Sequence, residues 1–389
     1  MRILFLAPHI NPFERPINGD TQRTQLLLRS CVAIGDVDVA MFVKAESTLG
    51  IDARIVFAEN VEPELRRISK VSKWLNLLRL WDTQALFPVD RKRERILDTI
   101  IAKNCYDLIV CRYFYRALAC GLWKYRDRLV VDFDDALPFY FMEQIKPESN
   151  WNTAVRMRIA AKEAVGITVR ASRRMRHSFF SNSENLPKVK ASFLPNVPFY
   201  QTSCGDVDFT VASPRLLFVG QIEYGPNQRG LDYFIKNIYA RIQRRIPDIR
   251  LTIVGRYDNP QLRDKWEAYH GVELKGFVDD LVAEYESCRV VVIPVYQCGG
   301  TNIKLLEAMQ MNRACVATVE TASALGDGFS MGDDLYVVSK DQEFVDGVCR
   351  LLTDEVENRR VARNALNKMN QYYNFDTFSR IVSDALTQQ

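Results

Sequence analysis

The sequence predicts an α/β protein with two Rossmann-like domains, and three observations support this prediction. Short β-rich runs alternate with longer helical patterns in the first half, the alternation begins again after residue 214, and a polar stretch separates the two series. Such alternation is typical of βαβ units around a parallel sheet. A chain of 389 residues, with 47% hydrophobic and 26% charged residues, is long enough for two such domains.

The first half begins with an apolar run at residues 3–6. Because Pro8 interrupts the apolar stretch, it is too short for a signal peptide and predicts a first buried strand instead. The other elements predicted in this half are a helix at 21–34 and strands at 37–42, 108–111 and 129–133.

The second half repeats the pattern after a stretch at 198–214 that is rich in Ser, Thr, Gly and Asp and has no apolar periodicity, which predicts a linker. We therefore expect an N-terminal domain at 1–200 and a C-terminal domain at 201–373. The terminal helix, 374–389, is a candidate to pack back on the first domain. The elements predicted in the second domain are strands at 215–219, 251–254, 272–274, 290–294 and 315–318 and helices at 229–245 and 301–311.

Charge is distributed unevenly along the chain. Residues 1–200 carry 31 Lys and Arg against 22 Asp and Glu, whereas residues 201–389 carry 21 against 26. A basic half favours an anionic partner such as a phospholipid surface, a phosphate-bearing substrate or nucleic acid. None of the nine cysteines has C-x-x-C spacing, and the apolar run at 290–296 is far below the ~20 residues of a membrane span. We expect a cytoplasmic protein, with neither a zinc ribbon nor a disulfide framework.

The strongest candidate site is the strand, glycine loop and helix between residues 290 and 317. Gly299 and Gly300 allow the backbone to approach a phosphate, and Thr301 is a candidate N-cap of a helix whose dipole favours anions. Lys304 and Glu307 are three residues apart and share a helix face, so the lysine could bind phosphate while the glutamate accepts from ribose hydroxyls. The alternative is a tight turn followed by a surface ion pair.

The run Gly-Gly-Thr-Asn-Ile-Lys-Leu-Leu-Glu-Ala-Met at 299–309, preceded by Val-Val-Val-Ile-Pro, resembles the donor-site segment of family-4 glycosyltransferases of the GT-B fold. The resemblance covers nearly the whole chain, densely at 193–320 and thinly at 45–105. In the first domain, residues 8–19 resemble the family's first loop. Further segments that resemble the family, in the family's order, are 193–197, 217–220, 251–256 and 274–278.

This resemblance implies two Rossmann-like domains that face a central cleft, with the donor mainly on the second. It implies transfer from a nucleotide sugar, with retention of configuration, to a glycan, glycolipid or lipid-linked acceptor in cell-surface polysaccharide or glycoconjugate synthesis. The nucleotide sugar is a co-substrate, and neither a further cofactor nor an obligatory metal is implied. A location in the cytoplasm, peripheral on the inner face of the membrane, fits this role.

The resemblance also implies roles for particular residues. Glu307 would bind the donor ribose, Lys304 and the 299–301 N–H groups the diphosphate, and the backbone around Phe277 the nucleobase. Gly19, with Asn18 before it, would let a first-domain loop close on the phosphates. For Gly220 and Phe277 the alternatives are a strand-ending glycine and a core side chain. The substrate-binding set is Asn18, Gly19, Gly220, Gln221, Arg256, Phe277, Gly299, Gly300, Thr301, Asn302 and Glu307, together with His9.

The sequence departs from the family pattern at three positions. The family's E-x7-E motif has its second glutamate at Glu307, but Gly299 stands in the place of the first. Gln221 and Asn227 stand where many members have arginine and lysine to neutralise the diphosphate. Lys304, with Arg229 or Arg256, is a candidate to supply the missing positive charge.

In the first domain, the acidic cluster Asp132, Asp134 and Asp135 follows a predicted strand, where many relatives carry a histidine that faces the transferred sugar. The period of two places Asp132 and Asp134 on one face and Asp135 on the other. A carboxylate there could act as general base or as an electrostatic partner of the transition state. The alternative is a solvated or helix-capping acidic loop. A D-x-D metal site is disfavoured, because that motif belongs to a one-domain architecture. The catalytic candidates are Asp134, Asp135 and Lys304.

Only three histidines are present. His9 follows the first strand and is a candidate to contact the acceptor or the sugar, with loop packing as the alternative. His177 and His270 are expected to be exposed.

Two basic stretches remain, at 65–95 and 156–176. Two tryptophans in 65–81 favour docking on an anionic membrane, whereas 156–176 fits a solvated basic face over an ordinary core.

Two other functions remain open. One is a sugar-nucleotide 2-epimerase of the same architecture, and the other is an inactive nucleotide-sugar-binding protein, which the missing first glutamate would explain. Nucleic-acid binding is not expected, because the basic half lacks a recognisable motif.

Overall fold

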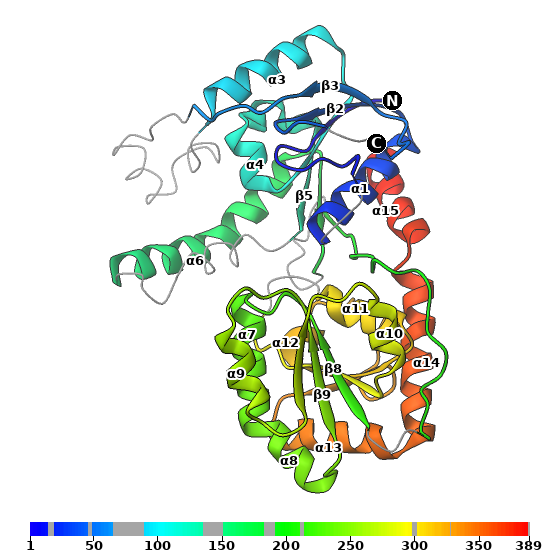
Figure 1. The fold of residues 1–389 in the computed structure, drawn as a ribbon. Helices are drawn as coiled ribbons and strands as arrows, with labels where there is room; N and C mark the ends of the chain where they lie inside the picture. The colour runs from blue at the N-terminus through cyan, green and yellow to red at the C-terminus, as the bar shows by residue number, and fades with distance from the viewer. Residues whose placement is uncertain are drawn as a thin grey trace. The chain divides into compact units, whose positions relative to one another are not determined.

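The computed structural model describes residues 1–14, 19–45, 49–64, 89–134, 151–182, 191–210, 214–297, 302–326 and 328–387. The chain divides into two compact units. Unit 1 comprises Met1–Pro195 together with Phe375–Gln389, and unit 2 comprises Asn196–Asn374. Figure 1 labels the elements of both. The predicted basic segment at 65–81 lies outside the described residues.

Unit 1 contains a seven-stranded parallel sheet of order β3-β2-β1-β4-β5-β6-β7. Strands β1 and β4 are neighbours, third and fourth in this order, so the loops that follow them leave the sheet at the point where the strand order reverses. Ligands of open α/β sheets bind at such points. The strands are β1 (Arg2–Leu6), β2 (Asp36–Met41), β3 (Arg54–Ala58), β4 (Leu108–Arg112), β5 (Leu129–Asp134), β6 (His177–Phe180) and β7 (Ala191–Phe193).

The terminal helix α15 (Phe375–Thr387) packs against α1 (Gly19–Val32) of unit 1. It buries Phe378, Val382 and Leu386, which are four residues apart and therefore lie on one side of the helix. The other helices of this unit are α3 (Arg91–Lys103), α4 (Phe114–Ala119), the 3₁₀ helix η2 (Leu122–Arg128) and α6 (Trp151–Arg174).

Unit 2 contains a six-stranded parallel sheet of order β10-β9-β8-β11-β12-β13, so its reversal point lies between β8 and β11. The five predicted strands agree with the observed ones to within two residues, because most of them are short runs rich in apolar residues, as strands buried in a parallel sheet require. The sixth strand, β13, was not predicted. The strands are β8 (Arg215–Val219), β9 (Arg250–Val254), β10 (Val272–Gly276), β11 (Val290–Ile293), β12 (Ala314–Thr318) and β13 (Tyr336–Val338).

The helix predicted at 229–245 begins earlier, at Gly225, because Pro226 fits the first helical turn. A Cβ atom at Gly230 would lie 1.9 Å from the carbonyl oxygen of Pro294, so this glycine allows the helix to pack directly on the end of β11. The helices of unit 2 are α7 (Gly225–Tyr233), continued by η4 (Phe234–Tyr239) and α8 (Ala240–Arg245), then α9 (Gln261–Glu267), α10 (Leu281–Glu286), α11 (Ile303–Gln310), α12 (Val319–Ala322), α13 (Asp341–Thr353) and α14 (Glu355–Tyr372).

Within the described ranges, no helix is both long and apolar enough to cross a bilayer.

Candidate functional site

The carboxyl ends of β8 and β9 meet at two glycines in unit 2. Gly220 follows β8, and its N–H donates to the carbonyl oxygen of Val254 at 3.0 Å. Gly255 follows β9 with a φ of +152°, and a Cβ atom there would lie 1.7 Å from the carbonyl oxygen of Gly220. Only glycine allows this close approach of the two backbones. Gly255 therefore has a packing role.

The side chain of Lys304, in the first turn of α11, lies over Gly220. A Cβ atom at Gly220 would come within 3.0 Å of Lys304 Cε, so the glycine leaves room for the lysine stem. The ammonium group donates to Asn302 Oδ1 at 2.8 Å and to Asn227 Oδ1 at 3.1 Å. Asn227 is buried, and its Nδ2 donates to the carbonyl oxygen of Gln221 at 2.7 Å. Two amides thus hold the ammonium group at the reversal point of the sheet.

Glu307, one helical turn after Lys304, is only 7% exposed. The alternative of a surface ion pair is therefore wrong for this residue. Burial raises the pKa of its carboxyl group to about 7, although a backbone hydrogen bond from Phe199 and the charge of Lys304 lower it. A buried carboxylate destabilises a folded chain unless partners compensate it, which makes Glu307 a candidate for a binding role.

Phe277, which follows β10, is 69% exposed, so the alternative of a core side chain is wrong. The Arg256 guanidinium lies 6.0 Å from the centroid of its ring. An exposed ring beside a cation at the end of a strand offers a surface for a planar ligand.

The loop before α11 is described only in part. Gly299, Gly300 and Thr301 lie outside the described residues. The prediction of Thr301 as N-cap is wrong, because Asn302 occupies the N-cap position of α11. The Asn302 side chain makes no capping hydrogen bond, and its Oδ1 accepts from Lys304 instead. Arg229, a candidate for compensating charge, donates to Gln297 Oε1 at 2.7 Å.

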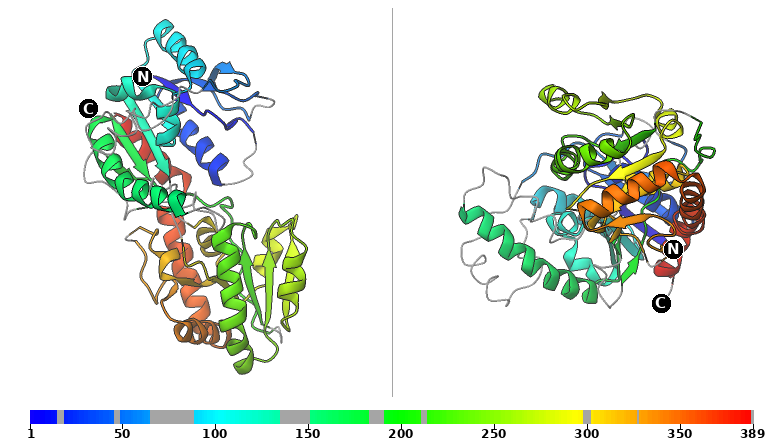
Figure 2. Two further views of the ribbon diagram at one scale, coloured as in Figure 1. Left: turned by 90° about the vertical axis from the view of Figure 1, so that its left-hand side faces the viewer. Right: turned by 90° about the horizontal axis from the view of Figure 1, so that it is seen from below.

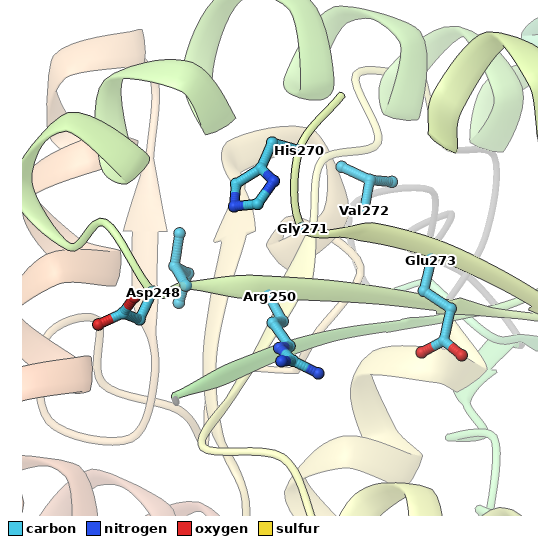
Figure 3. Close-up of a pocket in the computed structure, with 7 residues that line it drawn as sticks. Asp248, Arg250, His270, Gly271, Val272 and Glu273 are labelled. Atoms are coloured by element: carbon cyan, nitrogen blue, oxygen red, sulfur yellow. The ribbon is translucent and has the colours of Figure 1, made fainter. Parts of the chain in front are cut away.

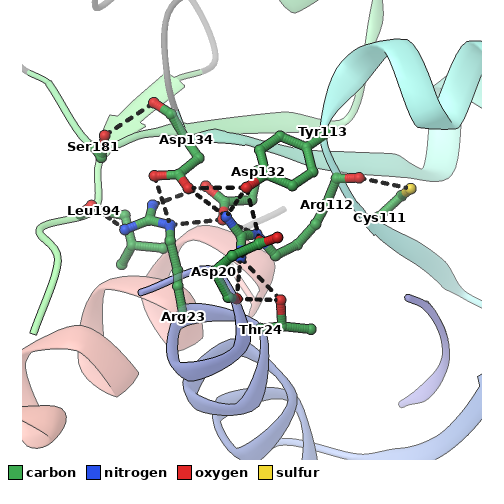
Figure 4. A network of polar contacts seen from close by, with 10 residues as sticks. All are labelled: Asp20, Arg23, Thr24, Cys111, Arg112, Tyr113, Asp132, Asp134, Ser181 and Leu194. Atoms are coloured by element: carbon green, nitrogen blue, oxygen red, sulfur yellow. Dashed lines mark hydrogen bonds and ion pairs between the residues drawn. The ribbon is translucent and has the colours of Figure 1, made fainter. Parts of the chain in front are cut away.

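Unit 1 contains a buried polar network at the carboxyl ends of β4 and β5 (Figure 4). Asp132 is fully buried between two arginines, and Arg23 of α1 approaches it through Nε at 2.7 Å and Nη2 at 2.8 Å. Arg112 Nε lies 3.1 Å from the same carboxylate. Burial favours the neutral acid, but the two guanidinium groups outweigh it and lower the pKa of Asp132. The alternative of a solvated acidic loop is therefore wrong for Asp132.

Asp134 ends β5 with a φ of +57°, and the strand pairing shifts register between Asp132 and Asp134. The Asp134 side chain is 14% exposed and forms an ion pair with Arg112, and its carboxylate lies 3.6 Å from Arg23. The backbone is held by Ser181, whose Oγ donates to the Asp134 carbonyl oxygen at 3.0 Å. Asp135 lies outside the described residues.

Sequence reasoning missed the partners in this network. Arg112 Nη1 lies 2.8 Å from Asp20 Oδ1, and the Tyr113 hydroxyl donates to the same oxygen at 2.7 Å. A usable signal was the charged residue at the end of the otherwise apolar strand β4, because a buried charge requires a partner. Gly19 is the first residue of α1, directly before Asp20, whereas Asn18 lies outside the described residues.

Asp132→Asn is expected to lower the free energy of unfolding by about 3 kcal/mol, because it leaves two buried guanidinium groups undercompensated. Asp127→Asn, on an exposed side chain of the same unit, is the matched control and is expected to change stability by less than about 0.5 kcal/mol. Urea unfolding of both variants measures the difference. Equal stabilities would show that the network does not support the fold.

His9 follows β1, and its Nε2 lies 3.2 Å from Arg93 Nη1. A guanidinium can only donate, so Nε2 accepts and the proton of the neutral ring is on Nδ1. Burial, Arg116 and Arg93 lower the pKa of His9 to about 4, which keeps the ring neutral near pH 7. The residue as a whole is exposed, so the burial of its ring is only partial.

The other two histidines differ in exposure. His270 is exposed as expected. The expectation for His177 is wrong, because it lies half-buried in β6 with Nε2 3.0 Å from Ser192 Oγ.

A hollow of about 320 Å³ lies at the opposite edge of the unit 2 sheet, beside the first residues of β9 and β10 (Figure 3). Asp248, Arg250, His270 and Glu273 are among its lining residues, and none of the predicted site residues lines it. Across the part of the chain that the structure describes, no three His, Cys, Asp or Glu side chains converge as a metal site would require.

Residues 213–354 match the family described as "Glycosyl transferases group 1". An uncharacterized 44.6 kDa protein in the cps region of Klebsiella pneumoniae is 21% identical over 366 residues, which cover 87% of this chain and 92% of that protein.

Two solved structures are similar over nearly their whole length. Sucrose-phosphate synthase from Thermosynechococcus elongatus matches with a TM-score of 0.66 at 14% identity, over 98% of this chain and 97% of that one. Anabaena Alr3699/HepE in complex with UDP and glucose matches with a TM-score of 0.62 at 14% identity, over 100% and 99%. The predicted fold class is confirmed: the chain has the α/β GT-B fold, with two parallel sheets flanked by helices.

Proposed function

We propose that this chain is a glycosyltransferase, which the match of residues 213–354 to that family supports. In this proposal it transfers a sugar from a nucleotide-sugar donor to a glycan, glycolipid or lipid-linked acceptor, with retention of configuration. One observation carries the proposal. At the reversal point of the unit 2 sheet, the ammonium group of Lys304 lies over Gly220, which follows β8. The buried carboxylate of Glu307 lies one helical turn further along α11.

Each part of this arrangement fits one part of a nucleotide sugar. Lys304 neutralises the diphosphate as the glycosidic bond to it breaks. Glu307 accepts hydrogen bonds from the ribose hydroxyls. The strand end at Phe277 receives the nucleobase, and Gly220, Gln221, Arg256 and Asn302 line the approach. The Anabaena Alr3699/HepE structure, which contains UDP and glucose, supports this class of donor.

In unit 1, we assign Asp134 an electrostatic role toward the positive charge that develops on the sugar. Its ion pair with Arg112 holds the carboxylate in place at the end of β5. We assign Asp135 to the same part of the sugar site. Gly19, Asn18 and His9 belong to the substrate-binding loops of this unit. No metal or further cofactor takes part in the proposed reaction.

We place this activity in polysaccharide synthesis in the cytoplasm, at the inner face of the membrane. The Klebsiella pneumoniae relative, described by its position in the cps region, supports this context. The basic first half of the chain fits an acceptor or a membrane surface that carries phosphate.

A thermal-shift screen with UDP-glucose, UDP-N-acetylglucosamine, GDP-mannose and ADP-glucose tests the proposal. A donor at a hundred times its Kd stabilises the folded protein by about 2.7 kcal/mol, which should raise the melting temperature by several degrees. The stabilising donor is then incubated with and without candidate acceptors. Transfer that requires an acceptor supports the proposal. An altered or released sugar from the donor alone would indicate the epimerase, and binding without turnover the inactive protein.

A further inference from the structure

The C-terminal half of helix α6 buries one side against the rest of unit 1. The buried residues are spaced three and four apart, as expected for the core-facing side of an amphipathic helix. In Figures 1 and 2, the N-terminal turns of α6 extend away from the sheet of unit 1. The buried side chains are Ala161, Ala164, Ile167, Thr168, Ala171 and Ser172.

Outside this buried side, α6 exposes three large apolar side chains. Trp151 is 76% exposed, Ile159 51% and Val165 56%. Basic side chains lie among them: at about 100° per residue, Trp151, Arg158, Lys162 and Val165 fall within an arc of about 60°. Among the described side chains of the helix, the exposed basic ones are Arg158, Lys162, Arg170, Arg173 and Arg174.

No acidic residue balances this charge within the helix except Glu163, which is half-buried and has a polar interaction of its own. An ordinary solvated helix face mixes charges of both signs and keeps large apolar side chains inside. The sequence pattern favoured such a solvated basic face at 156–176. The structure shows that this basic face also exposes a tryptophan and two aliphatic side chains.

The chemistry of this face distinguishes between anionic partners. A nucleic acid would satisfy the cations but would leave Trp151, Ile159 and Val165 without an apolar partner. A bilayer that contains anionic lipids satisfies both, because tryptophan and aliphatic side chains enter the boundary between headgroups and acyl chains while lysine and arginine contact the phosphates.

We propose that the outer face of α6, formed by Trp151, Arg158, Ile159, Lys162 and Val165, docks on a membrane surface rich in anionic lipids. This inference deepens the proposed function, because it places the enzyme where a lipid-linked acceptor would be found. Its test does not depend on transfer activity.

Co-sedimentation of the full chain with vesicles tests the inference. We expect binding to vesicles of phosphatidylcholine with a quarter phosphatidylglycerol, much weaker binding to phosphatidylcholine alone, and loss of binding as salt increases. Arg158→Glu with Lys162→Glu is expected to lower the partition coefficient at least tenfold. The matched control is Lys236→Glu with Arg244→Glu, which makes the same charge change on exposed residues of unit 2 and is expected to have little effect.

A separate fluorescence measurement tests the apolar part of this face. Brominated lipids should quench tryptophan fluorescence in the wild-type protein, and Trp151→Phe should lower that quenching; equal quenching in the variant would contradict the contact of Trp151 with lipid. Ile159→Ser with Val165→Ser should weaken binding without changing charge. Circular dichroism melting of each variant verifies that it is folded.

The inference is wrong if the Lys236/Arg244 control loses as much binding as the α6 variant, or if the protein binds heparin or RNA but not vesicles. Donor binding in the thermal-shift screen separates this failure from failure of the proposed function. If the protein binds a nucleotide sugar but no vesicle, the proposed function stands and the docking surface is refuted. If it binds vesicles but no nucleotide sugar, the docking surface stands and the proposed function is refuted.

Discussion

Replacing Lys304 by Met is expected to lower kcat about 10²–10³-fold while changing KM for the donor only a few-fold. Negative charge accumulates on the diphosphate as the bond to the sugar breaks, so the ammonium group stabilises the transition state more than the bound donor. Methionine keeps a stem of similar length over Gly220 but removes the charge. Steady-state kinetics with the donor found in the thermal-shift screen measures the effect.

The substitution also leaves Asn227 Oδ1 and Asn302 Oδ1 without the donor that each has in the wild-type protein. We expect a loss of about 1 kcal/mol in stability, which is too small to unfold the chain. Lys236→Met, on an exposed lysine of the same unit, is the control for loss of charge alone. Undiminished kcat in Lys304→Met would assign the lysine a purely structural role in holding the loop.

The second-unit site was largely predictable because its parts are close in sequence. Lys304 and Glu307 lie on one short helix, and their spacing alone places them on the same face. The burial of Glu307 was not predictable, because it depends on the fold around the helix and includes the backbone of Phe199. The same holds for Phe277, since an aromatic residue after a strand has no sequence signal that distinguishes exposure from burial.

The network of unit 1 illustrates the limit of sequence reasoning more strongly. Arg23 and Asp132 are 109 positions apart, and Arg112 and Asp20 are 92 apart. Only the strand order of the sheet brings them together. The register shift before Asp134 is likewise a tertiary feature, because its positive φ interrupts the simple alternation expected along the strand.

Glu307→Gln is expected to stabilise the protein without ligand and to weaken donor binding. The pKa of Glu307 is about 7 in the folded protein, above the ordinary value of 4.5. The folded state therefore holds more protons than the unfolded state between these values, and the contribution of Glu307 to stability falls as pH rises from 4.5 through 7. Glutamine removes this penalty. The gain should grow from under about 1 kcal/mol at pH 5 to about 3 kcal/mol at pH 8.

Donor affinity should change in the opposite direction. Hydrogen bonds from ribose hydroxyls to a carboxylate are stronger than those to a neutral amide, so we expect Kd to rise about tenfold or more. Urea unfolding at pH 5 and pH 8, with calorimetric titration of the donor at pH 8, measures both effects, and Glu267→Gln on the surface of unit 2 is the control. A misfolded variant would lose stability and affinity together. Unchanged donor affinity would remove Glu307 from the ribose site, and a gain in stability that does not vary with pH would mean that this carboxyl group does not titrate near neutrality.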